Sequence, residues 1–113
     1  MGGKGMDTAE FAGPDRRHHK LYVTRNTEYH VRDGRVIAVR KRGSSEWLTD
    51  HSALDMTIQG RVLADSVVPQ PGFPEPGDRL YLVAGVKSVV TSSIVAIERP
   101  PKEAVRAYPS LAA

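Results

Sequence analysis

The amino-acid sequence predicts a mainly all-β fold, a small antiparallel β-barrel or sandwich of about six or seven short strands with at most one or two short helical turns. Segments rich in β-branched and aromatic residues recur along the chain and are separated by frequent turn signals. An Asp-Gly pair lies between two such segments, and a stretch with four prolines excludes a long helix from the middle of the chain. The length of 113 residues suits one compact domain.

The strongest local signal is a hairpin formed by residues 28–32 and 35–40 around Asp33 and Gly34. An Asp-Gly pair readily adopts the positive φ angles of a type I′ turn, whose twist matches that of the flanking strands. The expected cross-strand pairs are Arg32 with Arg35, Val31 with Val36, His30 with Ile37 and Tyr29 with Ala38. This register predicts that Tyr29, Val31, Val36 and Ala38 share one apolar face.

Other strand-like segments precede and follow this hairpin. They comprise residues 21–25, 46–48, 57–64, 79–84 and 88–99. Gly60 indicates a bulge or tight bend in its segment, and the length of the last segment predicts a bend near Ser92. Residues 49–56 predict one or two helical turns, with Thr49 or Asp50 as the N-cap and Leu54 facing inward. A meander-like, partly closed barrel is the preferred topology.

The chain divides into three parts by composition. Residues 1–19 are rich in glycine and charge and are expected to form an arm, with a short helical turn near residues 8–11. Residues 20–101 form the single β-domain, and within it residues 65–78 form a proline-rich loop. The Pro100-Pro101 pair ends the sheet, so residues 102–113 are expected to form a tail. A short helix is expected within it over residues 103–108.

Composition excludes several classes of protein. The chain has no cysteine, which rules out disulfides, thiolate metal sites and thiol nucleophiles and fits a reducing cytoplasm. It has no apolar stretch of the roughly 18–20 residues that a membrane helix needs, and its first residues lack the apolar region of a secretory signal. We therefore expect a cytoplasmic protein with no membrane association.

The sequence contains no motif that predicts an enzyme or a cofactor site. Asp50, His51 and Ser52 are the residue types of a hydrolytic triad, but consecutive side chains do not converge as such a triad requires. On a helix His51 and Asp55, four residues apart, would share one face and supply two metal ligands. The expectation is instead that both belong to a surface turn. A hydrolase or metal-binding protein thus ranks third among the functions considered.

Positive charge is concentrated in the first part of the chain. Ten Lys and Arg oppose five Asp and Glu through Ser45, and six oppose eight after it. This asymmetry makes an electrostatic nucleic-acid-binding barrel the alternative function, although a merely solvated basic face is the simpler explanation. The residues assigned to it are Arg16, Arg17, Lys20, Arg32, Arg35, Arg40, Lys41 and Arg42. Tyr29 and Trp47 are expected in the core rather than as platforms for bases.

The leading prediction is a non-enzymatic domain that makes protein–protein contacts and self-associates as an assembly or adaptor subunit. A proline-stiffened loop carries Phe73, which is expected to fold back over an open end of the barrel as a plug and is alternatively displayed to a partner. In the tail, apolar residues recur every three positions and could dock on a neighbouring molecule. The residues assigned to partner binding are Arg32, Arg35, Arg40, Lys41, Arg42, Phe73, Val105, Tyr108 and Leu111.

Overall fold

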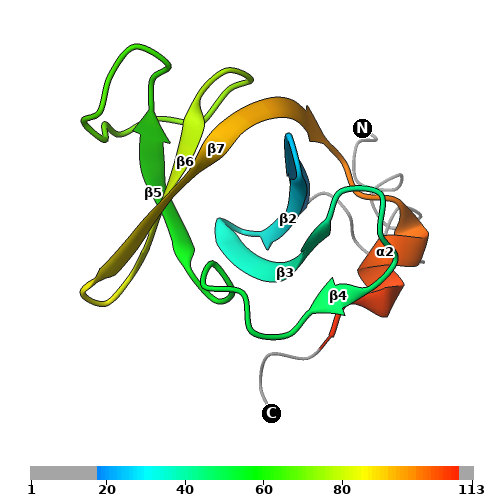
Figure 1. Ribbon diagram of the computed structural model, residues 1–113. Helices are drawn as coiled ribbons and strands as arrows, with labels where there is room; N and C mark the ends of the chain where they lie inside the picture. The colour runs from blue at the N-terminus through cyan, green and yellow to red at the C-terminus, as the bar shows by residue number, and fades with distance from the viewer. Residues whose placement is uncertain (1–17, 110–113) are drawn as a thin grey trace, which may run out of the picture.

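Residues 18–109 are described by the computed structural model, which contains seven strands and one short helix (Figure 1). The strands are β1 (His19–Thr24), β2 (Thr27–Arg32), β3 (Arg35–Lys41), β4 (Trp47–Leu48), β5 (Thr57–Val62), β6 (Arg79–Ala84) and β7 (Lys87–Glu98), and the helix is α2 (Lys102–Ala107). The predicted helical turn near residues 8–11 lies outside the described residues. The predicted fold class is confirmed.

Six of the strands close an antiparallel barrel in the order β1-β2-β3-β5-β6-β7, and β7 pairs back onto β1. Each barrel strand pairs with the barrel strand that follows it in the sequence, and β7 pairs with β1 to close the barrel. The barrel is therefore a meander, as the preferred topology predicts. The short strand β4 pairs with the far end of β3 and is the additional, seventh strand. Closure leaves the barrel strands without a long free edge.

The β2–β3 hairpin has the predicted turn but only part of the predicted register. Asp33 and Gly34 have φ angles of 51° and 84°, as a type I′ turn requires. The pairs nearest the turn form as predicted, Arg32 with Arg35 and Val31 with Val36. Beyond them a bulge shifts the register, and the pairs are His30 with Ala38 and Tyr29 with Val39.

This bulge corrects the predicted apolar face. One extra residue on β3 reverses the direction of every side chain beyond it. Val39, and not Ala38, therefore joins Tyr29 in the barrel core, whereas Ala38 is buried on the outer face with His30. The core inside the barrel consists of Tyr22, Tyr29, Val31, Val36, Val39, Ala53, Met56, Leu80, Leu82 and Ile94.

Two further register shifts occur at the predicted positions, near Gly60 and near Ser92. The β5–β6 register shifts between Ile58 and Gly60, and the β6–β7 register shifts opposite Ser92. Gly60 is buried, and a Cβ atom there would collide with the backbone carbonyl of Gln70. The absence of a side chain at residue 60 thus allows the proline-rich loop to lie against β5.

Residues 49–56 form turns instead of the predicted helical segment. The side chain of His51, rather than Thr49 or Asp50, accepts a hydrogen bond from the backbone N–H of Ala53 at 3.1 Å. Ala53 is fully buried, while the predicted inward residue Leu54 is only partly buried against the core. Asp55 has a φ angle of 70°, which ends the turn because a continuing helix needs negative φ.

Helix α2 lies on the side of the barrel away from the β6–β7 hairpin (Figure 1). The chain reaches it from the end of β7 through Pro100, which is buried. Side chains that point outward from β1, β2 and β3 include the buried residues Leu21, Val23, His30 and Ala38. No helix within the described residues is long and apolar enough to cross a membrane.

Candidate binding site at the barrel mouth

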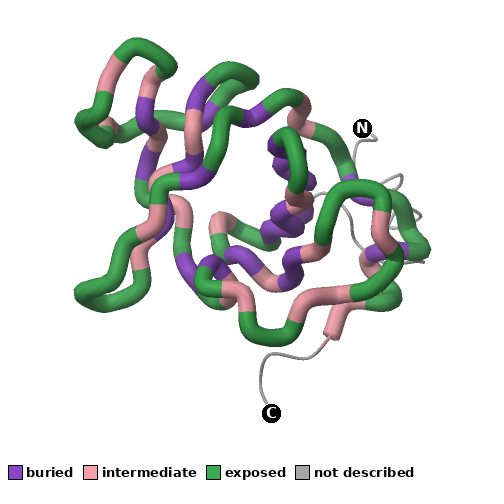
Figure 2. The backbone as a smooth tube through the Cα atoms, in the orientation of Figure 1, coloured by how far each residue is buried: buried purple, intermediate pink, exposed green. Residues whose placement is uncertain are grey.

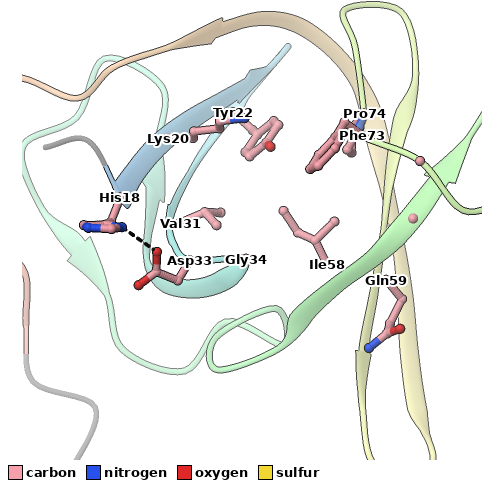
Figure 3. A pocket seen from close by; sticks show the side chains of 12 residues that line it. His18, Lys20, Tyr22, Val31, Asp33, Gly34, Ile58, Gln59, Phe73 and Pro74 are labelled. Atoms are coloured by element: carbon pink, nitrogen blue, oxygen red, sulfur yellow. Dashed lines mark hydrogen bonds and ion pairs between the residues drawn. The ribbon is translucent and has the colours of Figure 1, made fainter.

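A pocket of about 550 Å³ opens at the end of the barrel where the β2–β3 hairpin turns (Figure 3). Strand β1, the end of β2, strand β5 and the proline-rich loop all contribute to it. The lining residues are His18, Lys20, Tyr22, Val31, Asp33, Gly34, Ile58, Gln59, Gly60, Gly72, Phe73 and Pro74. Its volume falls within the usual range for ligand pockets, roughly 300–1,000 Å³.

The interior of this pocket is apolar. Tyr22 and Val31 belong to the barrel core, and Ile58 packs against the same core from β5. Phe73 and Pro74 face them from the proline-rich loop across the opening (Figure 3). Phe73 remains 84% exposed, so it stands at the rim and leaves the barrel mouth open rather than plugging it.

The rim of the pocket carries three groups that can be charged. Lys20 is paired across the strands with Val31, and its Nζ lies 5.7 Å from the centre of the Phe73 ring. His18 Nδ1 is 3.0 Å from an Asp33 carboxylate oxygen, and the His18 carbonyl accepts the Asp33 backbone N–H at 2.9 Å. The pocket therefore combines an apolar interior with a lysine and a His–Asp pair at its entrance.

The loop that presents Phe73 is held on the barrel by several hydrogen bonds. Arg61 and Gln70 exchange two backbone hydrogen bonds of 2.9 Å. The Arg61 guanidinium lies 3.1 Å from Asp78, whose carboxylate also accepts the Glu75 backbone N–H at 2.9 Å. A side chain on so constrained a loop loses little conformational entropy when it is buried by a partner.

None of the twelve residues that line the pocket is Ser or Thr. What the arrangement can do is enclose an apolar group while the Lys20 ammonium lies near an acceptor or an anion.

A second cluster of polar side chains lies on the outer face of the barrel. His30 is fully buried, and its Nδ1 is 2.7 Å from the Tyr108 hydroxyl while its Nε2 is 3.0 Å from Glu28. Arg40 donates to the same Glu28 oxygen at 2.8 Å and lies over the Trp47 ring, 4.4 Å from its centre. Because a carboxylate only accepts hydrogen bonds, the neutral His30 carries its proton on Nε2. Its Nδ1 then accepts a hydrogen bond from the Tyr108 hydroxyl.

The pKa values in this cluster agree with a structural role. Burial lowers the pKa of His30, against the opposing effect of Glu28. Burial also acts to raise the pKa of Glu28, but the hydrogen bonds from Arg40 and His30 outweigh it and lower that pKa. Burial raises the pKa of Tyr108 well above its usual value, so its hydroxyl is not an activated nucleophile. The cluster fastens the C-terminal tail to β2.

The residues predicted for partner binding are dispersed over the barrel. Arg32 and Arg35 stand at the hairpin tip, where Arg35 pairs with Asp55 and Arg32 lies 3.9 Å from Asp33. Arg40 is engaged in the outer-face cluster. Phe73 lies at the barrel mouth, the same end of the barrel as the hairpin tip, because Asp33 and Gly34 of the turn line the same pocket.

The remaining predicted residues occupy other surfaces. Lys41 and Arg42 lie at the opposite end of the hairpin from Arg32 and Arg35. In the tail, Val105 is half-buried and Tyr108 is bonded to the chain's own His30. Leu111, Arg16 and Arg17 lie outside the described residues. The structure thus does not bring the predicted residues together into one surface.

Sequence reasoning missed the pocket because its residues come from four separate segments. Ile58 and Val31 were expected only as strand residues, and Lys20 only as part of a basic run. Strand alternation does place Lys20 on the same side of β1 as Tyr22, and this was the available signal.

The two residues weighed as metal ligands are both engaged elsewhere. Asp55 pairs with Arg35, and His51 accepts the Ala53 N–H while its ring meets that of Tyr29 edge-on at 5.9 Å. In the part of the chain that the structure describes, no three His, Asp or Glu residues gather as a metal site requires.

Comparisons of this chain with family models, with curated proteins and with solved structures find no match.

Proposed function

We propose that this chain is a non-enzymatic β-domain that makes protein–protein contacts, and that its partner is another copy of the same chain. One observation carries the proposal. Within residues 18–109, every strongly exposed large apolar side chain lies between residues 67 and 95. These side chains are Val67, Val68, Phe73, Val86, Val90 and Val95.

Four of them, Val67, Val68, Phe73 and Val86, lie in two projections on one side of the molecule, whereas Val90 and Val95 lie on β7. The proline-rich loop and the β6–β7 turn both project from the side opposite α2 (Figure 1). Most residues in both projections are exposed, as the green segments in Figure 2 show. Single exposed valines are ordinary on protein surfaces, but the grouping of four exposed apolar side chains in two neighbouring projections favours an interaction surface.

The barrel mouth supplies a complementary hollow for such a contact. Val86 is fully exposed at the tip of the β6–β7 hairpin, next to Gly85 with a φ angle of 61°. A protruding apolar tip and a concave apolar pocket on the same chain allow a head-to-tail contact between copies. In this arrangement Val86 of one copy enters the pocket beside Phe73 of the next.

The strength expected of this contact is modest. Burying one valine contributes about 1.5–3 kcal/mol, whereas association costs an estimated 4–15 kcal/mol. Several of the six exposed side chains must therefore be buried together, and we expect a dissociation constant no tighter than about micromolar. The reducing environment that suits a cysteine-free chain supports a cytoplasmic location for this assembly.

The test is the solution mass of the full chain over a range of concentrations, measured by light scattering on a sizing column. We expect the mass to rise above the 12.4 kDa of the monomer as concentration increases. A mass that stays at the monomer value up to millimolar concentration contradicts the proposal.

Variants locate the contact. Val86→Asp and Phe73→Ala should each return the protein to the monomer, because each removes one side of the proposed apolar contact. Both residues are exposed, so neither change should unfold the domain. Thr49→Asp, an exposed position remote from both projections, is the control and should leave the mass unchanged. Self-association that survives both test variants overturns the assignment of the surface.

A further inference from the structure

A basic hollow lies at the opposite end of β1, β2 and β3 from the barrel mouth. Its volume is about 470 Å³, and its lining residues are Arg25, Asn26, Thr27, Lys41 and Arg42. The β2–β3 register brings the two segments together, since Thr27 pairs with Lys41 and the Arg42 N–H donates to the Asn26 carbonyl at 2.9 Å.

The charge of this hollow is not compensated within residues 18–109. None of the five lining residues is acidic, and Arg25, Lys41 and Arg42 have no ion pair with any described residue. By contrast, Arg35, Arg40 and Arg61 each lie against a carboxylate. Like charges held together repel one another, and a bound anion would remove that repulsion.

The backbone around the hollow is fixed by hydrogen bonds. The hydroxyl of Thr24, a buried residue, donates to the Thr27 carbonyl at 3.2 Å across the β1–β2 turn. On the other side the Ser44 N–H donates to the Lys41 carbonyl at 3.0 Å, and Gly43 adopts a φ angle of 84°. A site whose backbone is held before binding loses less entropy when a ligand arrives.

We infer that this hollow binds a phosphate group. Two guanidinium groups can each donate two parallel hydrogen bonds to phosphate oxygens, and a lysine adds a third positive charge. The Asn26 amide supplies a neutral donor. The lining includes no apolar side chain, so the hollow favours a hydrated anion over an apolar ligand.

This inference is independent of the proposed self-association, because it uses none of the residues of the apolar surface. A free phosphate compound and the backbone of a nucleic acid share the chemistry that the hollow recognises. The two sources are separated by experiment.

The experiment follows the backbone amide signals of the full-length protein by NMR while inorganic phosphate or pyrophosphate is added. Sodium chloride keeps the ionic strength constant. We expect shift changes centred on residues 25–27 and 41–43, with pyrophosphate binding more tightly than phosphate. Shifts that match those of a chloride-only titration, or that centre on the hairpin tip at Arg32 and Arg35, overturn the inference.

Substitutions test which cations are responsible. Arg25→Ala and Arg42→Ala should each weaken pyrophosphate binding by at least about fivefold, as loss of a charge-assisted bidentate contact predicts. Arg32→Ala, an exposed arginine at the other end of the same hairpin, is the matched control and should not change it. Equal weakening in all three variants indicates general charge attraction and contradicts a site.

A titration with a short oligothymidylate then identifies the source of the phosphate. Binding that needs Arg25 and falls steeply with salt assigns the hollow to a nucleic-acid backbone. If only the small phosphates bind through Arg25, the ligand is a free phosphate compound and the inference stands. If oligothymidylate binds equally well without Arg25 and pyrophosphate does not bind, the inference is wrong.

Discussion

The Tyr108 hydroxyl donates to Nδ1 of His30 across 2.7 Å, joining two residues that lie 78 positions apart in the chain. This contact ties the segment after α2 to the middle of β2. The rings of Tyr108 and His30 also meet edge-on, with centres 5.2 Å apart, and Trp47 packs against both. The tail is therefore part of the folded domain up to this residue.

Removing the Tyr108 hydroxyl should destabilise the protein. In Tyr108→Phe, His30 keeps its buried position but loses the donor to Nδ1, which leaves a buried acceptor without a partner. Such a loss costs about 1–3 kcal/mol of unfolding free energy. Urea unfolding measures it, and Tyr81→Phe, a half-buried tyrosine on β6, is the control expected to change little. Equal stability of Tyr108→Phe and the parent would show that the hydrogen bond contributes nothing.

The unfolding free energy should also decrease as the pH is lowered, and this decrease should begin at a pH higher than that at which carboxylates titrate. Burial lowers the pKa of His30 and of His51 in the folded protein, so the unfolded chain binds more protons as the pH falls through the unfolded-state value of about 6.5. The contribution of the two neutral histidines to the unfolding free energy is therefore fully present above that pH. It is lost progressively as the pH falls from that value to the folded-state pKa values. Glu28, whose folded pKa is lowered, adds a second loss at more acidic pH.

Urea unfolding at a series of pH values measures this dependence, and variants assign it. His30→Gln should reduce the loss between about pH 7 and 5, and His51→Gln should remove most of what remains. A stability that is flat across this interval in the parent protein contradicts the lowered folded-state pKa values of both histidines.

Gly60 should tolerate no side chain. A Cβ atom at this position would meet the Gln70 carbonyl, which belongs to backbone and cannot move aside without breaking the Arg61–Gln70 pairing. Gly60→Ala should therefore lower the unfolding free energy by roughly 1–3 kcal/mol, the usual cost of overpacking a core site. Gly34→Ala is no useful control because of its positive φ angle, so the exposed Ser45→Ala serves instead. Unchanged thermal stability of Gly60→Ala would mean that the loop does not lie against β5.

Local patterns were sufficient to predict the strands and the Asp33-Gly34 turn. Turn chemistry and β-branched runs depend on neighbouring residues only, so residues 79–84 were placed without error as β6. The barrel mouth could not be predicted in the same way, because Lys20, Ile58 and Phe73 meet only after the barrel closes. The pairing of Tyr108 with His30 is a tertiary contact of the same kind, and periodicity in the tail gave no sign of it.

The bulge in β3 shows how a single residue limits such prediction. Nothing in the run from Arg35 to Lys41 marks Ile37 as the extra residue, since an unbroken alternation would equally place Ala38 in the core. The structure places Val39 there because the larger side chain fills more of the barrel interior and makes more dispersion contacts.

Isosteric substitution distinguishes the two registers. Val39→Thr keeps the shape of the side chain but places a hydroxyl in the apolar core, where it costs about 1–3 kcal/mol if it finds no partner. Val95→Thr makes the same change at a half-exposed position of β7 and should cost less than about 0.5 kcal/mol. Urea unfolding of both variants decides the matter. If Val39→Thr is as stable as Val95→Thr, residue 39 does not lie in the apolar core, β2 and β3 pair without the bulge, and Ala38 lies in the core instead.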